Sequence, residues 1–392
     1  MIRILRIINR FNIGGPTYNA TFLTRYMSDD FETLLIGGLP EEGEADSLYI
    51  TKEYGVEPLL IPEMKRVPNL KSDREAYKKI KSVIEEFRPH IVHTHAAKAG
   101  AIGRKAAKDC GVPVIIHTFH GHVFHSYFGK AKTWLYKNIE RNLAGRSTGI
   151  IAISEVQKKE LSKDFKICKA EKIKVIPLGF DLSKFQENLA ENRKATRDHY
   201  RIKEDETAIA IIGRLAPIKN HAFFLEVIDD ILKTSNAEKI KVFIVGNGEM
   251  YAEIEAKVLE INSKYGFQPI VMTSWIKDIP AFNAGMDIIC LTSKNEGTPV
   301  SLIEAQAAGV PVITTNVGGV QDIIDQKNTG FVVNSFAEYV EKLRFLIENE
   351  KKRQEMSQNG WAFVKEKFHY TRLVKDMEDY YKELLKQKGI EC

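Results

Sequence analysis

The segment Asn295-Glu-Gly-Thr-Pro-Val-Ser-Leu-Ile-Glu304 is the most informative part of this 392-residue chain. Thr298 suits the N-cap position of a helix and Pro299 its first helical position, so we expect the helix to begin between the two carboxylates. Glu296 then lies in the loop, and Glu304 lies on the helix, whose side chains tilt back toward its N-terminus. The spacing predicts a pocket surrounded by two carboxylates and the free backbone N–H groups of the first helical turn.

This segment suits a ligand that carries both hydroxyl groups and a phosphate. Carboxylates accept hydrogen bonds from sugar hydroxyls, and a helix N-terminus attracts an anion. The two carboxylates repel that anion unless cations lie nearby. The loop Gly213-Arg-Leu-Ala-Pro-Ile-Lys219 supplies Arg214 as a planar fork and Lys219 as a point charge. Unrelated surface acids and ordinary surface cations are the alternative explanation.

Both segments follow short apolar runs, and such runs alternate with amphipathic stretches along the chain. The alternation is typical of a parallel sheet covered by helices, and a polar stretch at residues 179–206 interrupts it as a plausible hinge. We therefore predict an α/β fold with two doubly wound domains, at residues 1–190 and 191–366. The predicted strands are Ile2–Ile8, Thr33–Ile36, Pro58–Ile61, His90–His95, Pro113–Thr118, Gly149–Ser154, Ile173–Pro177, Ala208–Ile212, Lys241–Val245, Pro269–Thr273, Asp287–Leu291 and Val310–Thr315.

The chain reads as helical from about Ala337 to its end. The last stretch, Phe368–Lys388, places five large apolar side chains roughly on one face. This helix either packs on its own domain or crosses back to the first one. We assign residues 367–392 to the second alternative, a helix that returns to the N-terminal domain. The five side chains are Phe368, Leu373, Met377, Tyr381 and Leu384.

Composition excludes several classes of protein. Hydrophobic residues make up 44% and charged residues 28% of the chain, with 26 Gly and 13 Pro, so the chain is neither disordered nor collagenous. No apolar run approaches the roughly 18 residues that a membrane span requires. The N-terminal stretch is interrupted by Arg3 and Arg6 and has no small-residue cleavage site, so we interpret it as a first strand rather than a signal peptide.

Cysteine spacing and charge narrow the choice further. Cys110, Cys168, Cys290 and Cys392 are far apart, which favours neither disulfides nor a zinc site and fits a reducing cytoplasm. A net charge of +5 is too mild to indicate nucleic acid. In residues 101–150, however, eight Lys and Arg face two acids, and this suits an anionic membrane surface or a phosphorylated substrate.

Two glycine-containing loops follow predicted strands. Gly14-Gly15 opens a helix, where paired glycines let backbone N–H groups approach a phosphate, although a merely tight turn has the same sequence. Gly246-Asn247-Gly248 follows a later strand. Neither loop has the GxGxxG spacing of a dinucleotide-binding site.

Taken together, these segments resemble the retaining glycosyltransferases of family 4, which have the GT-B fold of two Rossmann-like domains facing across a cleft. The resemblance is carried, in the family's order, by Gly14-Gly15, Thr118-Phe-His-Gly121, Ile176–Asp181, Gly213-Arg214-Leu215 with Lys219, Met286–Thr292, the E-x7-E pair Glu296 and Glu304, and Ala307–Gly319. Two positions depart from the family pattern. Leu178 stands where Asn is usual, and Thr298-Pro299 replaces the commoner aromatic or Leu followed by Gly, which bears on contacts to the donor sugar.

The resemblance implies that the second domain holds a nucleotide-diphospho-sugar. Glu304 would accept from the ribose hydroxyls, Glu296 would contact the donor sugar, and Arg214 with Lys219 would hold the diphosphate. The other implied substrate contacts are Gly213, Gly297, Thr298, Pro299, Val300 and Ser301 for sugar and phosphate, Gly246, Asn247, Trp275 and Ile276 for the base, with uracil favoured, and Gly14 and Gly15 for the phosphate from the first domain.

The resemblance also implies catalysis without a divalent metal or another cofactor. Cationic side chains and helix dipoles stabilise the leaving diphosphate, and the chain has no D-x-D metal motif. Six histidines crowd residues 93–125 of the first domain, namely His93, His95, His117, His120, His122 and His125. Of these, His120 matches the family's active-site histidine, and His122 is the second candidate. Retention implies an α-linked product, and since no motif carboxylate is an evident nucleophile we favour front-face attack. The implied catalytic residues are thus His120, Glu296, Arg214 and Lys219.

Residues 119–146 interleave aromatic with basic side chains, as in proteins that contact the membrane interface. A helix with its apolar face in the core and its lysines outside is the alternative. The residues concerned are Phe124, Tyr127, Phe128, Trp134, Leu135 and Tyr136, with Lys130, Lys132, Lys137, Arg141 and Arg146.

The sequence therefore predicts a cytoplasmic, retaining, metal-independent glycosyltransferase. Its partners would be a UDP-sugar donor, a lipid-linked or saccharide acceptor of polysaccharide, lipopolysaccharide or glycolipid assembly, and the surface of an anionic membrane, but no nucleic acid. Two other functions fit the same architecture. A nucleotide-sugar epimerase would need no acceptor, and a non-catalytic nucleotide-sugar-binding subunit would not need the four charged motif residues, all of which are present.

Overall fold

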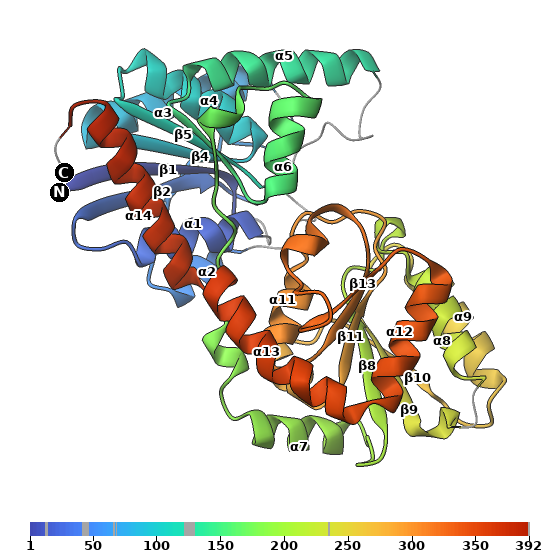
Figure 1. The fold of residues 1–392 in the computed structure, drawn as a ribbon. Helices are drawn as coiled ribbons and strands as arrows, with labels where there is room; N and C mark the ends of the chain where they lie inside the picture. The colour runs from blue at the N-terminus through green and yellow to red at the C-terminus, as the bar shows by residue number, and fades with distance from the viewer. Residues whose placement is uncertain are drawn as a thin grey trace. The chain divides into compact units, whose positions relative to one another are not determined.

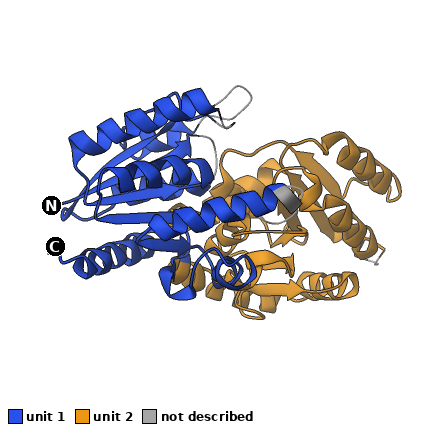
Figure 2. Cartoon of the chain, turned by 90° about the horizontal axis from the view of Figure 1, so that it is seen from above, with its two compact units in different colours: residues 1–180, 368–392 blue, residues 181–367 orange. Residues whose placement is uncertain are grey.

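A computed structural model describes residues 1–11, 15–40, 47–65, 67, 69–120, 130–233 and 236–390 of the chain. The backbone forms two compact units, Met1–Phe180 together with Phe368–Cys392, and Asp181–Lys367 (Figure 2). Each unit is built around one parallel sheet with helices on both faces (Figure 1). The predicted pair of doubly wound α/β units is confirmed.

The first unit contains a seven-stranded sheet in the order β3-β2-β1-β4-β5-β6-β7. Its strands are β1 (Ile2–Arg10), β2 (Phe31–Gly38), β3 (Leu59–Leu60), β4 (Ile91–His95), β5 (Val114–Phe119), β6 (Gly149–Ala152) and β7 (Ile173–Val175). Its helices are α1 (Gly15–Arg25), α2 (Leu48–Glu53), α3 (Leu70–Phe87), α4 (Ala97–Asp109), α5 (Lys130–Arg146), α6 (Glu155–Lys159) and α14 (Tyr370–Gln387).

The second unit contains a six-stranded sheet in the order β10-β9-β8-β11-β12-β13. Its strands are β8 (Thr207–Ile212), β9 (Ile240–Val245), β10 (Ile270–Thr273), β11 (Ile288–Leu291), β12 (Val312–Thr315) and β13 (Gly330–Val333). Its helices are α7 (Leu189–His199), α8 (His221–Ile231), α9 (Tyr251–Ser263), α10 (Ile279–Gly285), α11 (Val300–Ala307), α12 (Phe336–Glu348) and α13 (Glu350–Phe368), which ends at the boundary between the units.

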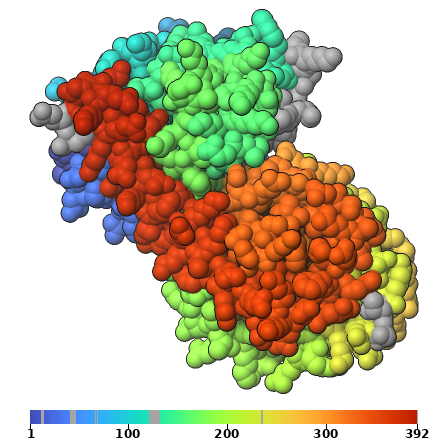
Figure 3. All heavy atoms as spheres, viewed as in Figure 1, coloured from blue at the N-terminus to red at the C-terminus, as the bar shows by residue number. Residues whose placement is uncertain are grey.

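Side-chain alternation gives the sheet of the first unit two different faces. Leu5, Ile7 and Val92 pack under α3 and α4, whereas Ile4 and Ile91 pack under α14. The C-terminal helix therefore returns to the first unit, as predicted, and its outer face lies on the surface there (red in Figure 3). The five apolar side chains expected on its inner face, from Phe368 to Leu384, are all buried.

The polar stretch at residues 179–206 was interpreted as a hinge between the domains. The two units do divide in it, between Phe180 and Asp181, but most of the stretch is folded into the second unit. It contains α7, which packs against α10 within the second unit, so this unit begins at Asp181 rather than after residue 190. Two of its charged residues have structural partners, because Arg193 and Arg197 both bind the carboxylate of Asp287. Polar composition alone did not distinguish a linker from a helix whose arginines are used inside the fold.

Within the described parts of the chain, no helix is both long enough and apolar enough to cross a membrane.

Candidate active site

The candidate site of the second unit lies where its strand order reverses. Strand β8 is central, with β9 on one side and β11 on the other, and all three strands are parallel. The helices that follow β8 and β11 diverge from this point, so the loops after these strands border a crevice at the carboxyl edge of the sheet. The residues predicted to bind the diphosphate follow β8, and the predicted carboxylates follow β11.

Glu296 and Lys219 meet at this edge. The Lys219 Nζ lies 2.6 Å from Oε1 of Glu296, and the Lys219 and Glu296 side chains are 25% and 11% exposed. The hydroxyl of Ser293 also donates to Oε1 of Glu296, over 2.5 Å. The ion pair brings the two predicted loops together and orients the carboxylate, and Ser293 is a supporting residue that the sequence analysis did not identify.

Two glycines, Gly318 and Gly319, pack against the backbone of the Glu296 turn. Gly318 has a positive φ of 53°, and a Cβ there would lie 1.8 Å from the carbonyl oxygen of Glu296. A Cβ on Gly319 would lie 2.2 Å from the carbonyl oxygen of Gly297, and the N–H of Gly319 donates to Glu296 O over 3.2 Å. A side chain at either position would push the turn outward. The backbone of the Glu296 turn can therefore lie this close to residues 318 and 319 only because both are glycines.

Helix α11 begins one residue later than predicted. Pro299 is the N-cap, with φ −72° and ψ 100°, and Val300 is the first helical residue. The extended ψ of Pro299 prevents it from starting the helix, and Thr298 makes no capping hydrogen bond. Pro299 itself is buried, whereas Gly297 is exposed and Thr298, Val300 and Ser301 are partly exposed. The N–H of Leu302 donates to Pro299 O over 3.2 Å, which leaves the amides of Val300 and Ser301 for an anion, as expected for a helix N-terminus.

Glu304 lies on the second turn of α11 and is partly buried. Burial raises the pKa of its carboxyl to about 7, although the charge of Lys184 acts in the opposite direction. Its carboxylate accepts no hydrogen bond from the described residues. A ligand that offers hydroxyl donors would therefore stabilise the ionised form.

The loops after β8, β9 and β10 are tightly joined. A Cβ on Gly246, whose φ is 143°, would lie 2.0 Å from Gly213 O and 3.7 Å from the ring of Trp275. The N–H of Leu215 donates to Asn247 O over 3.0 Å. Trp275 is 55% exposed, so its ring offers a flat surface beside backbone that has no side chains.

Arg214 and Ile276 lie on the same set of loops. The Arg214 side chain is exposed and makes no hydrogen bond or ion pair within the described residues. Ile276, after β10, is partly exposed. All residues of the second unit that were predicted to bind the donor therefore lie along one edge of its sheet, after β8, β9, β10 and β11.

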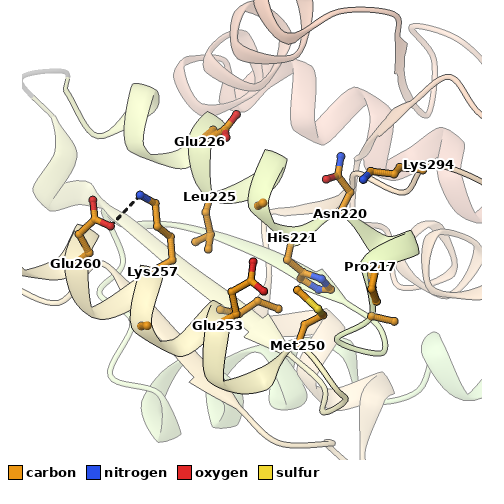
Figure 4. A pocket seen from close by; sticks show the side chains of 14 residues that line it. Pro217, Asn220, His221, Leu225, Glu226, Met250, Glu253, Lys257, Glu260 and Lys294 are labelled. Atoms are coloured by element: carbon orange, nitrogen blue, oxygen red, sulfur yellow. Dashed lines mark hydrogen bonds and ion pairs between the residues drawn. The ribbon is translucent and has the colours of Figure 1, made fainter.

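A separate pocket of about 430 Å³ opens between α8 and α9 (Figure 4). His221 points into it and is 3% exposed, and neither ring nitrogen has a hydrogen-bond partner among the described residues. Burial lowers the pKa of His221 to about 4, so the ring is neutral at pH 7. None of the predicted donor-binding residues lines this pocket, but Ala216, Pro217 and Asn220 from the loop after β8 do, so the pocket adjoins the edge described above.

In the first unit, the predicted residues are only partly described. Gly15 is the first residue of α1, and its open surroundings fit a close backbone approach by a ligand. His120 follows β5, and its Nε2 lies 2.9 Å from Nδ1 of His95. Gly14 and the second candidate, His122, lie outside the described residues.

Comparison with known proteins agrees with this architecture. Residues 14–184 match the family model "Glycosyltransferase Family 4", and residues 192–362 match "Glycosyl transferases group 1". The chain is 30% identical to the capsular polysaccharide biosynthesis glycosyltransferase CapM of Staphylococcus aureus over 86% of this chain and 88% of that protein. It is 28% identical to the UDP-Gal:alpha-D-GlcNAc-diphosphoundecaprenol alpha-1,3-galactosyltransferase of Escherichia coli, over 89% and 92% of the two chains.

Among solved structures, Anabaena Alr3699/HepE in complex with UDP superposes with a TM-score of 0.79 at 17% identity, covering 97% of this chain and 100% of that one. This likeness agrees with the two-domain GT-B fold. Because each family model covers a different half of the chain and the bacterial relatives are similar over most of their length, the chain belongs to the family 4 glycosyltransferases.

Proposed function

We propose that the chain transfers a sugar from a UDP-sugar to a lipid-linked or saccharide acceptor, with retention of configuration, in polysaccharide or glycolipid assembly. The observation that carries this proposal is the Lys219–Glu296 pair at the carboxyl edge of β8 and β11, with exposed Arg214 in the same loop as Lys219. The relatives support the substrate class. The name of the E. coli relative specifies UDP-galactose and a diphosphoundecaprenol-linked acceptor, and the S. aureus relative is named for capsular polysaccharide.

In this proposal, positively charged side chains neutralise the negative charge of the leaving group. Arg214 and Lys219 neutralise the diphosphate, and the amides at the start of α11 add their dipoles. Glu304 accepts from the ribose hydroxyls, and Glu296 accepts from a hydroxyl of the donor sugar. Trp275, Ile276 and the backbone around Gly246 and Asn247 surround the base. No divalent metal or other cofactor is needed for these roles.

The proposed reaction is front-face substitution at the anomeric carbon. The bond between this carbon and the β-phosphate oxygen breaks through an oxocarbenium-like state, and UDP leaves with the bonding electrons. The acceptor oxygen forms its bond on the same face, and its proton passes to a phosphate oxygen of UDP. His120 contributes a hydrogen bond to a substrate oxygen in the first unit.

An assay with a synthetic polyprenyl-diphosphate-linked sugar as acceptor and a panel of UDP-sugars tests this function. We expect transfer of one sugar in the presence of EDTA and an α-anomeric signal in the NMR spectrum of the product. A β-linked product, or transfer only after a divalent metal is added, contradicts the proposed mechanism. Rapid epimerisation of the donor without acceptor would favour the epimerase instead.

We also propose that α5 contacts an anionic membrane. Trp134 and Leu135 in its N-terminal half and Ile139 just past its middle are 66%, 51% and 41% exposed, whereas Leu143 and Ala144 near its C-terminus are buried. The helix therefore packs on the core at one end and offers apolar side chains to solvent at the other. Lys132 and Lys137 lie on the same exposed half, so this end combines apolar and basic groups as interfacial helices do.

Sedimentation with vesicles of phosphatidylglycerol and phosphatidylcholine tests the contact. The wild type should bind at low salt, and Trp134→Ala/Leu135→Ala and Lys132→Glu/Lys137→Glu should each reduce the bound fraction strongly. The control, Lys52→Glu/Lys108→Glu, makes the same charge change on α2 and α4 and should bind like the wild type. No binding by the wild type, or an equal loss in the control, would refute contact through α5.

A further inference from the structure

A buried cluster of histidines lies behind His120 in the first unit. Because alternate residues of a strand face the same side, His93 and His95 on β4 share the face covered by α14. Arg6 on β1 donates to Nδ1 of His93 over 3.1 Å, and the Tyr381 hydroxyl on α14 lies 2.6 Å from the same nitrogen. Since a guanidinium only donates, this nitrogen is an acceptor. The proton of neutral His93 is therefore on Nε2, from which it reaches Thr118 Oγ1 over 2.7 Å.

His95, the second histidine of β4, forms a hydrogen bond with His120. Its Nδ1 lies 2.9 Å from Nε2 of His120, and the two ring centroids are 5.1 Å apart, so the rings meet edge to edge through these nitrogens. His95 is fully buried, and its own ring lies 4.2 Å from the ring of His93. Burial lowers the pKa of His95 well below its usual value and that of His120 to about 4, so both rings are neutral at pH 7. Each ring then has a single N–H.

Two arrangements of these protons are open to the pair. If His120 donates from Nε2, the proton of His95 is on its own Nε2, a buried atom without a partner among the described residues. If His95 donates from Nδ1, its Nε2 carries only a lone pair, and the proton of His120 is on Nδ1. Each arrangement leaves one buried N–H without a partner among the described residues, on Nε2 of His95 in the first and on Nδ1 of His120 in the second. Such a donor needs a ligand or a water molecule as its partner. His95 is fully buried, whereas His120 is partly exposed at the end of β5, so the second arrangement places the N–H on the residue that a ligand can approach. Among the residues that the structure describes, Nδ1 of His120 has no hydrogen-bond partner, so its N–H is left for a ligand.

We propose that His95 is a positioning residue: its Nδ1–H donates to Nε2 of His120 and thereby makes Nδ1–H of His120 a fixed hydrogen-bond donor to a substrate oxygen. The step that uses this donor rests on the proposed glycosyl transfer, but the proton position does not. In this arrangement His120 is a donor rather than a general base, since its only basic nitrogen is occupied by His95. Tyr381, Arg6 and Thr118 fix the ring of His93, against which the ring of His95 packs.

Nitrogen-15 NMR of the histidine side chains tests the proton position directly. In the wild type at pH 7, the signals lost in His120→Asn should show a protonated Nδ1 and an unprotonated Nε2. In His95→Leu, those signals should shift toward the Nε2–H tautomer. A wild-type His120 that carries its proton on Nε2 overturns the proposal, and this measurement needs neither substrate nor a variant of His95.

Kinetics test the consequence for catalysis. His95→Leu should lower kcat about tenfold or more while the KM for the donor changes little, and His95→Asn, whose amide can still donate, should recover most of the loss. The control is His117→Leu, because buried His117 bonds Thr94 and not His120, and its kcat should stay near that of the wild type. Equal losses in His95→Leu and His117→Leu, or unchanged kcat in a folded His95→Leu, contradict the proposal. If no donor sugar is transferred by the wild type, the proposed function fails while the NMR result still decides the tautomer.

Discussion

Replacing Glu296 by Gln is expected to lower kcat at least about 100-fold, because a charged contact made in the transition state is lost. The carboxylate receives Lys219 Nζ at 2.6 Å and the Ser293 hydroxyl at 2.5 Å, and an amide keeps the size of the side chain but not its charge. Lys219 then has no counter-charge, so UDP should bind as tightly as to the wild type or more tightly. The predicted result is a loss of turnover without a loss of nucleotide affinity.

The matched control is Glu253→Gln on the rim of the separate pocket between α8 and α9. It removes a carboxylate from the same unit without touching the carboxyl edge of β8 and β11. Initial rates at saturating donor and calorimetric titration with UDP measure both effects. A Glu296→Gln enzyme with nearly normal kcat would refute the role assigned to this carboxylate.

Replacing Asp287 by Ala is expected to destabilise the second unit by about 3–5 kcal/mol, as is usual when one partner of a buried ion pair is removed. Asp287 Oδ1 accepts from Arg193 over 2.7 Å, and its Oδ2 accepts from Arg197 over 3.1 Å and from the N–H of Ala208 over 2.8 Å. Arg197 is buried, so its guanidinium would lose its counter-charge inside the fold. The carboxylate joins α7 to the starts of β8 and β11, so its loss should open the sheet that carries the site.

Native-state hydrogen exchange of the β8 and β11 amides measures the free energy of opening in this unit. Asp198→Ala is the control, because Asp198 lies on the same helix but is exposed and, within the described ranges, its side chain pairs only with Lys194 one turn away. It should cost about 0.5 kcal/mol or less. Similar protection in the wild type and in Asp287→Ala would contradict the structural role of the buried carboxylate.

Apolar runs predicted most of the fold because strands covered on both faces are almost continuously apolar. Strand β13, Gly330–Val333, escaped prediction, since its apolar run is only the three residues after Gly330 and lies between polar turns. The polar stretch that contains α7 was misread because Arg193 and Arg197 have the composition of a solvated linker but bind Asp287. The composition of a segment shows that it is polar, but it does not show whether its charged side chains form ion pairs within the fold.

The placement of the candidate site residues was predictable where their position after a strand decides it. Arg214, Lys219, Glu296 and Glu304 all follow β8 or β11, whose carboxyl ends adjoin at the reversal of strand order. The direct pairing of Lys219 with Glu296 could not be predicted, because their loops are brought together only when β8 and β11 pair.

Two supporting contacts needed three-dimensional information for the same reason. Ser293 has no sequence signal beyond a hydroxyl after a strand, yet it donates to Glu296. His95 was one of six crowded histidines, and only the pairing of β4 with β5 places it beside His120.

The central claim is that protein cations, and not a bound metal ion, hold the diphosphate of the donor in the second unit. Calorimetric titration of the wild type and Lys219→Ala with UDP, in buffer containing EDTA, tests it most directly. We expect the wild type to bind UDP in EDTA and Lys219→Ala to bind about 10- to 100-fold more weakly, as for the loss of a charge-assisted contact. Binding that appears only with a divalent metal, or that is unchanged in Lys219→Ala, would contradict the account.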